Sequence, residues 1–232
     1  MTTATERARI EGTTKYRKSV ISPTNNKLFV EVLKPGKNNK KLGGLITKGR
    51  WRGKYLYALT LEERKTCPRY CHHWEDCYGN NMPFAKRYNV NPSLLPAIHG
   101  DIMRLRNKHP MGIVIRLHVL GDFYSPEYVN FWVQMMEAWP NLCLFGYTAR
   151  WGDDTQYAIH TLLNQRYPSR CVIRYSRNQE YDETLNTRFA ADETFKGAAF
   201  TCPEQTGKTD ACATCGLCWS AGGNKTVRFI SH

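Results

Sequence analysis

The sequence predicts an α/β fold with a parallel sheet and a cysteine-rich, metal-binding C-terminal tail. Apolar strand patterns alternate with amphipathic helix patterns at least three times, which is typical of a parallel sheet with right-handed crossovers. The 232 residues are 41% hydrophobic and 23% charged, which is enough for one principal core. We therefore expect a basic N-terminal arm and strand at 1–50, an α/β core at 51–200 and a cysteine-rich segment at 201–232.

Four apolar runs are expected to be the core strands, because each is short and rich in β-branched or aromatic residues. The first of them leads directly to Cys67, so a cysteine loop follows a core strand. An alternating pattern at 27–33 predicts one further strand. The four core strands are expected at 54–60, 112–120, 142–148 and 171–176.

Three helices are expected between these strands. Ser93 can cap the first helix, and Pro96 fits its first turn. Ser125 opens the second helix and Pro140 ends it. The expected ranges are 91–108, 125–140 and 155–167.

Ligands of parallel α/β sheets gather at the carboxyl ends of the strands. The first cysteine loop is expected at that edge, together with the polar residues that end the other strands. The expected strand ends are Thr60, Gly121–Asp122, Tyr147–Thr148 and Tyr175–Ser176.

The cysteines point to metal ligation. No apolar stretch approaches the roughly 18 residues of a membrane span, and the N-terminus lacks a secretory apolar core, so we expect a cytoplasmic protein with no membrane partner. Thiols stay reduced there, and nine clustered cysteines favour metal ligation over disulfides. Cys143 and Cys171 lie inside strand patterns and are expected to be buried hydrophobic residues.

The positive charge is concentrated near the N-terminus. The net charge is +13, and residues 1–54 hold fourteen Lys and Arg against Glu6, Glu11 and Glu31. A basic segment of this kind attracts phosphates, so the arm is a candidate contact for nucleic acid. The alternative is a solvated basic leader.

The first cysteine group is a single loop with the spacing C-x3-C-x5-C. Cys67, Cys71 and Cys77 supply three thiolates, which can hold three corners of a four-iron cluster and leave the fourth iron open. A structural zinc ion needs four protein ligands, and His72 or His73 could complete such a set. We expect an iron–sulfur centre here, with zinc as the alternative.

The second group contains four cysteines beyond residue 200. Its C-x2-C-x2-C run matches ferredoxin-type four-iron sites, whereas zinc ribbons more often use two separated C-x2-C pairs. Four thiolates coordinate a cluster fully, which favours electron transfer or a structural role. A segment too short for its own apolar core needs its metal to fold. The expected ligands are Cys202, Cys212, Cys215 and Cys218.

A three-cysteine loop directly after a core strand is similar to the radical S-adenosylmethionine superfamily. That superfamily usually has C-x3-C-x2-C, whereas this chain has C-x3-C-x5-C with Asp76 before the last cysteine. The resemblance implies a partial (β/α) barrel or an open parallel sheet, and S-adenosylmethionine at the open iron. Gly121 and Asp122 occupy the place of the Gly-Gly-Glu-like stretch that holds the methionine amine. Tyr147 is expected to line the same cavity, and the alternative for Asp122 is a helix cap or turn residue.

A further set of short motifs runs from about residue 55 to the C-terminus. The motifs are Cys67-Pro68, Cys71, Cys77-Tyr78, 118–123, 145–148, 202–205 and Cys212-x2-Cys215-x2-Cys218-Trp219, ending at His232. Together they resemble the phage gene product 88 family. The resemblance implies a viral or mobile-element protein that acts inside a bacterium, with an iron–sulfur, radical-SAM-like fold, and it implies no particular reaction.

Two main functions follow. One is an enzyme with two 4Fe–4S clusters, whose open iron near Cys67 binds S-adenosylmethionine. The other is a non-catalytic iron–sulfur protein that binds nucleic acid through its basic arm, or binds a host protein. A binding module held together by zinc is a third interpretation. The substrate is not named by the sequence.

Overall fold

The computed structural model describes residues 14–23, 31–176, 189–191, 199–220 and 226–230. Its main element is an eight-stranded mixed sheet, and a separate two-stranded sheet pairs β1 (Val20–Ile21) with β4 (Arg87–Tyr88) in parallel. The strand order of the main sheet is β2-β3-β5-β6-β7-β8-β10-β9. Its strands are β2 (Lys34–Pro35), β3 (Tyr55–Ala58), β5 (Ile113–Leu117), β6 (Cys143–Thr148), β7 (Cys171–Ser176), β8 (Phe189–Ala191), β9 (Ala199–Thr201) and β10 (Thr226–Arg228).

Neighbouring strands from β3 to β8 are parallel and follow each other in chain order. Tyr55 pairs with Ile113, and Leu144 pairs with Cys171. The carboxyl ends of these strands therefore meet at one edge of an open sheet. At the other side of β3, the short strand β2 runs antiparallel.

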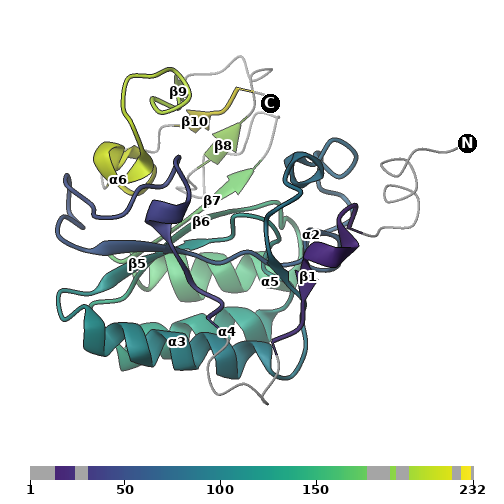
Figure 1. Ribbon diagram of the computed structural model, residues 1–232, viewed down its shortest axis with the longest axis horizontal. Coiled ribbons are helices and arrows are strands. Elements are labelled where there is room, and N and C mark those ends of the chain that lie inside the picture. The colour runs from purple at the N-terminus through teal and green to yellow at the C-terminus, as the bar shows by residue number, and fades with distance from the viewer. Residues whose placement is uncertain (1–13, 24–30, 177–188, 192–198, 221–225, 231–232) are drawn as a thin grey trace, which may run out of the picture.

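Helices cover one face of this sheet, which lies below the strands in Figure 1. They are α3 (Leu94–Lys108), α4 (Pro126–Ala138) and α5 (Asp154–Ala158), which continues into the π-helix η4 (Ile159–Gln165). The Ser125 hydroxyl accepts from the Tyr128 amide at 3.3 Å, so the expected cap begins α4. The buried apolar cluster between helices and sheet includes Ile98, Trp132 and Ile159 from the helices and Ile115, Leu144 and Ile173 from the strands.

The opposite face is covered by segments from both ends of the chain. Residues 42–51 and the C-terminal helices α6 (Cys212–Cys215) and η6 (Leu217–Trp219) close a second apolar cluster there, above the sheet in Figure 1. Trp51 stacks on Trp219 with ring centroids 5.4 Å apart. Val114 and Phe145 face this second cluster, because alternate residues of a strand point to opposite faces.

The four core strands and three helices of the core are confirmed, with ends that differ by a few residues from the expected ranges. The strand expected at 27–33 lies partly outside the described residues; Val32 and Leu33 are buried but form no strand. In the described part of the cysteine-rich tail, Cys212, Ala213 and Trp219 pack in a cluster with residues of the sheet. Within the described parts of the chain, no helix is long and apolar enough to cross a membrane.

Candidate metal centres

The first cysteine loop begins where β3 ends, after the short helix α2 (Glu63–Thr66). The Cys67 amide donates to the Glu63 carbonyl at 2.9 Å, which ends α2 at the first cysteine. Burial raises the pKa of the Cys67 thiol well above its ordinary value, and the nearby Asp122, Cys71 and Cys77 raise it further. The three thiols of this loop and Asp122 are thus close enough to influence one another's charge.

A buried ion pair anchors the far end of this loop. Arg87 is fully buried, and its Nε donates to a Glu63 carboxylate oxygen at 2.9 Å. Its other nitrogens donate to the carbonyls of Gly79 and Ala85 at 2.8 and 2.7 Å, and to the Ser19 hydroxyl at 2.8 Å. One guanidinium group therefore joins α2, the cysteine loop and the N-terminal segment.

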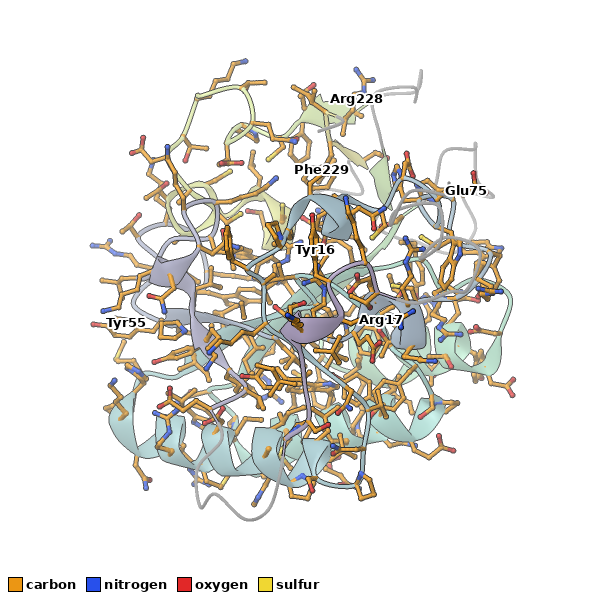
Figure 2. The ribbon with its side chains drawn as sticks, turned by 45° about the vertical axis from the view of Figure 1, so that its right-hand side comes forward. Tyr16, Arg17, Tyr55, Glu75, Arg228 and Phe229 are labelled. Carbon is orange, nitrogen blue, oxygen red and sulfur yellow. The ribbon has the colours of Figure 1, made fainter. Side chains whose placement is uncertain are left out.

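The N-terminal segment packs on the same loop. The Tyr16 hydroxyl donates to the Asn80 carbonyl at 2.8 Å, and the Arg87 guanidinium lies over the Tyr16 ring. In Figure 2, Tyr16 and Arg17 lie in front of the sheet, with Glu75 of the loop to the right and Phe229 above. The described part of the expected basic arm is therefore part of the fold.

Gly121 and Asp122 lie at the carboxyl end of β5, against the start of the cysteine loop. Gly121 has φ +86°, and a Cβ there would come within 2.7 Å of Leu61 Cβ and Thr66 Oγ1. The Asp122 carboxylate accepts from the amides of Phe123 and Ala149 at 2.7 and 2.8 Å. Burial raises the pKa of Asp122 to about 6, although these hydrogen bonds and that of the Thr148 hydroxyl act in the opposite direction.

A second link joins the loop to the end of β6. Arg150 donates to the carbonyls of Phe123 and Thr66 at 2.7 and 3.0 Å, and pairs with Asp153 at 3.2 Å. The Tyr70 hydroxyl donates to the same Asp153 carboxylate at 3.0 Å. Arg150 thus has a structural role: it holds the residue before Cys67 and the chain after β5 together, at the sheet edge where the sequence predicts ligands.

The second group gathers its four cysteines around one hollow at the surface of the C-terminal segment, together with Pro203, Glu204 and Trp219. Gly216, with φ +73°, ends α6 in the left-handed conformation and directs the chain into η6, which carries the fourth cysteine. The amides of Cys212 and Ala213 donate to the carbonyls of Lys41 and Leu42 at 2.8 and 2.9 Å. The hollow is lined by Cys202, Cys212, Cys215 and Cys218.

Tyr147 contacts this second group. Its hydroxyl donates to Cys218 Sγ at 3.0 Å, and Arg174 Nε donates to the Cys218 carbonyl at 3.0 Å. Burial raises the pKa of the Cys218 thiol, whereas the Tyr147 hydroxyl and the Arg174 and Arg116 guanidinium groups act in the opposite direction. These contacts favour the thiolate, which is the form that binds metal.

Arg116 lies between the two groups. Its guanidinium carbon is 5.0 Å from the centroid of the Tyr147 ring, and its Nε is buried without a hydrogen-bond partner among the described residues. Burial lowers the pKa of Arg116, but the neighbouring hydroxyls of Tyr147 and Tyr78 and the thiols of the second group more than offset this. Tyr78 directly follows Cys77 and donates to the Val119 carbonyl. Tyr78, Arg116 and Tyr147 therefore connect the first loop to the second group.

Three other residues lie in or against the apolar clusters. His118, the first residue of the 118–123 motif, faces the helix-covered core, where its Nε2 is 3.0 Å from the Tyr128 hydroxyl, and burial lowers its pKa to about 3. Cys143 and Cys171 are buried in the two apolar clusters, as expected. The sequence pattern did not predict the Glu63–Arg87 pair or the role of Tyr78. The Cys-Tyr sequence at 77–78 is a signal for Tyr78, but not for the Glu63–Arg87 pair.

The four thiols of the second group line one hollow. Among the described residues, no group of three or more His, Cys, Asp or Glu is arranged to hold a metal ion. His73, a candidate zinc ligand, has its Nδ1 3.2 Å from the Asp76 carboxylate. Four thiols around one hollow, with two arginines beside them, suit a group that carries negative charge and spreads its ligands over several iron atoms.

Comparisons with known proteins give one match. The family model described as gene product 88 matches residues 20–229. This range includes all seven cysteines of the two groups. No curated protein and no solved structure matches the chain.

Proposed function

The chain belongs to the gene product 88 family, and on that premise we propose that it is a phage iron–sulfur protein that works as a radical S-adenosylmethionine-type enzyme in the bacterial cytoplasm. Cys67, Cys71 and Cys77 would hold a 4Fe–4S cluster with one open iron. The four cysteines of the second group would hold a fully ligated cluster.

One observation carries this proposal. The seven cysteines outside the strands divide into three at the carboxyl edge of the sheet, near Asp122, and four around one hollow on the C-terminal segment. The consecutive parallel order of the strands, with the helices on one face, supports the same interpretation. Ligands in such sheets bind at this edge.

The residues of the chain would bind and orient the cofactor. When bound, the open-site cluster supplies the electron that cleaves S-adenosylmethionine reductively. Asp122 is expected beside the methionine amine. Its carboxylate has about four lone-pair sites, and the amides of Phe123 and Ala149 and the Thr148 hydroxyl use three of them. We propose that the remaining site of this buried carboxylate, which is 2% exposed, accepts from the amine once the cofactor is bound.

Metal analysis of anaerobically purified protein tests the centres. The parent should carry about eight irons per chain, with matching sulfide. Cys71→Ser should remove only the first centre and Cys215→Ser only the second. Cys143→Ser, which changes a buried cysteine outside both groups, should retain both. Stoichiometric zinc with negligible iron and sulfide would overturn the proposal.

Addition of S-adenosylmethionine tests the enzyme. In reduced protein it should perturb the electron paramagnetic resonance spectrum of the first cluster alone, and Asp122→Ala should weaken the perturbation without loss of iron. Deoxyadenosine should form under strong reductant. An unperturbed spectrum and no cleavage would decide against the enzyme and leave an iron–sulfur binding protein.

The second candidate is a non-catalytic iron–sulfur or zinc module that binds nucleic acid or a host protein. Its support is a set of exposed basic side chains on residues 14–54, the segment that carries most of the positive charge. These are Lys37, Lys40, Lys48 and Arg52. Nucleic-acid binding without S-adenosylmethionine cleavage would favour it.

A further inference from the structure

We infer that Tyr147, Arg116 and Arg174 raise the reduction potential of the centre at Cys202, Cys212, Cys215 and Cys218. They would thereby make it a redox site, beyond a structural role. This inference rests on the proposed iron–sulfur function of that group. It assigns a role to residues on the sheet, far from the cysteines in sequence.

Tyr147 contacts a sulfur atom of the second cysteine group. The Tyr147 hydroxyl donates to Cys218 Sγ at 3.0 Å, across 71 positions of the chain. Hydrogen bonds to the sulfurs of an iron–sulfur cluster are among the factors that set its potential. A donor stabilises the reduced cluster more strongly, because that form carries one more negative charge.

Two positively charged side chains lie close to Cys218 and Tyr147. Arg174 is 2% exposed and donates to the Cys218 carbonyl at 3.0 Å. Arg116 lies over the Tyr147 ring, with its guanidinium carbon 5.0 Å from the centroid. A nearby cation in a partly buried site acts with little screening by solvent, so both arginines favour the form with more negative charge.

The side chains of Tyr147 and the two arginines point to the same face of the sheet. Val114, Phe145 and Val172 face the second apolar cluster, on three adjacent strands. Residues two positions further along point to the same face. Arg116, Tyr147 and Arg174 stand at those positions. Tyr147 and Arg174 are register partners, and Arg116, opposite Phe145, lies diagonally to Tyr147, so all three face the C-terminal segment.

A potentiometric titration followed by electron paramagnetic resonance tests the inference on protein with both clusters. In Arg116→Met the reduced-to-oxidised ratio of the second centre at a fixed potential should fall about tenfold, a shift of about 59 mV for one electron. Tyr147→Phe, which keeps the ring and removes the donor, should lower the ratio several-fold. The first centre should keep its potential in Tyr147→Phe.

Arg166→Met, which changes a surface arginine, is the matched control and should leave both potentials unchanged. Iron clusters with unchanged potentials in both test variants would overturn this inference alone. Zinc at the second group would overturn it together with the proposed function. If Arg116→Met does not load its cluster, Tyr147→Phe decides the question by itself.

Discussion

Among single residues, Arg87 has the strongest consequences for the first cysteine loop. It is fully buried, pairs with Glu63 and donates to two loop carbonyls. Removal of one partner of a buried ion pair leaves an uncompensated charge and costs about 3–5 kcal/mol. Arg87→Met should therefore lower the free energy of unfolding by about that amount, and the first cluster should be lost before the second.

Thermal unfolding and iron content measure both effects. The control is Arg166→Met, because the Arg166–Glu137 pair has about half of each side chain exposed. Exposed pairs contribute at most about 1 kcal/mol. Equal losses of stability in the two variants would show that Arg87 does not organise the loop.

His118 gives a prediction for pH. Its pKa is lowered to about 3 by burial and, to a smaller extent, by Arg116, whereas the unfolded imidazole has a pKa near 6.5. The unfolded state thus binds more protons between these values, and the free energy of unfolding falls as the pH falls through this window, by at most about 1.4 kcal/mol per pH unit.

His118→Gln should remove this contribution, so its loss of stability between pH 6 and pH 4 should be shallower than that of the parent. Denaturant titrations at several pH values measure it. Asp122, with its pKa raised to about 6, acts with the opposite sign in both proteins, so the comparison of the two isolates His118. Parallel pH profiles would contradict the prediction.

Among elements, the junction between the end of β3 and the end of β5 depends on Gly121. Any side chain there meets φ +86° and contacts of 2.7 Å with Leu61 and Thr66. Gly152 has φ +71° but nothing within 4 Å of its Cβ position. Gly152→Ala should cost about 1–2 kcal/mol from the backbone alone. Gly121→Ala should cost about 1–3 kcal/mol more, because of overpacking.

Unfolding free energies of the two glycine variants measure the difference directly. The gap between them reports the close approach of Leu61 and Thr66, just before the cysteine loop, to the end of β5. If Gly121→Ala costs no more than Gly152→Ala, these residues move away at no cost, and the end of β5 is not held against them.

The core strands could be predicted from the sequence, because a short apolar run such as 142–148 indicates a buried strand without any information about distant residues. The helix that begins after Ser125 could be predicted for the same local reason, a cap followed by proline. The pairing of Tyr147 with Cys218 could not, since it depends on how the C-terminal segment folds back over the sheet. The shared face of Arg116 and Tyr147 could have been predicted from the sequence, because side chains alternate between the two faces along each strand.

For the whole molecule, the charge distribution predicts where the proposed nucleic-acid partner would bind. Within residues 1–13, Arg7 and Arg9 offset Glu6 and Glu11, so the surplus of positive charge belongs to residues 14–54. Replacement of four exposed cations by Gln should weaken nucleic-acid binding and reduce its salt dependence, by about 0.9 in log–log slope for each phosphate that the variant no longer neutralises. The four are Lys37, Lys40, Lys48 and Arg52.

Deletion of residues 1–13 changes no net charge and is the matched control, with an unchanged slope expected. Fluorescence anisotropy at a series of salt concentrations measures both proteins. If the deletion abolishes binding and the fourfold variant does not, the exposed cations of residues 14–54 are not the contact. If neither protein binds, the candidate nucleic-acid function is wrong.

The stacking of Trp51 on Trp219 has a consequence for biosynthesis. A ribosome that has produced residues 1–200 has made every core strand of the sheet, but the apolar face that includes Val114 and Phe145 still lacks the C-terminal part of its cover. A nascent chain at that stage exposes apolar surface that is prone to aggregation. Burial of that surface and assembly of the second cysteine group depend on the same segment, so, if that group holds the proposed cluster, a shortage of metal should increase aggregation of newly made chains.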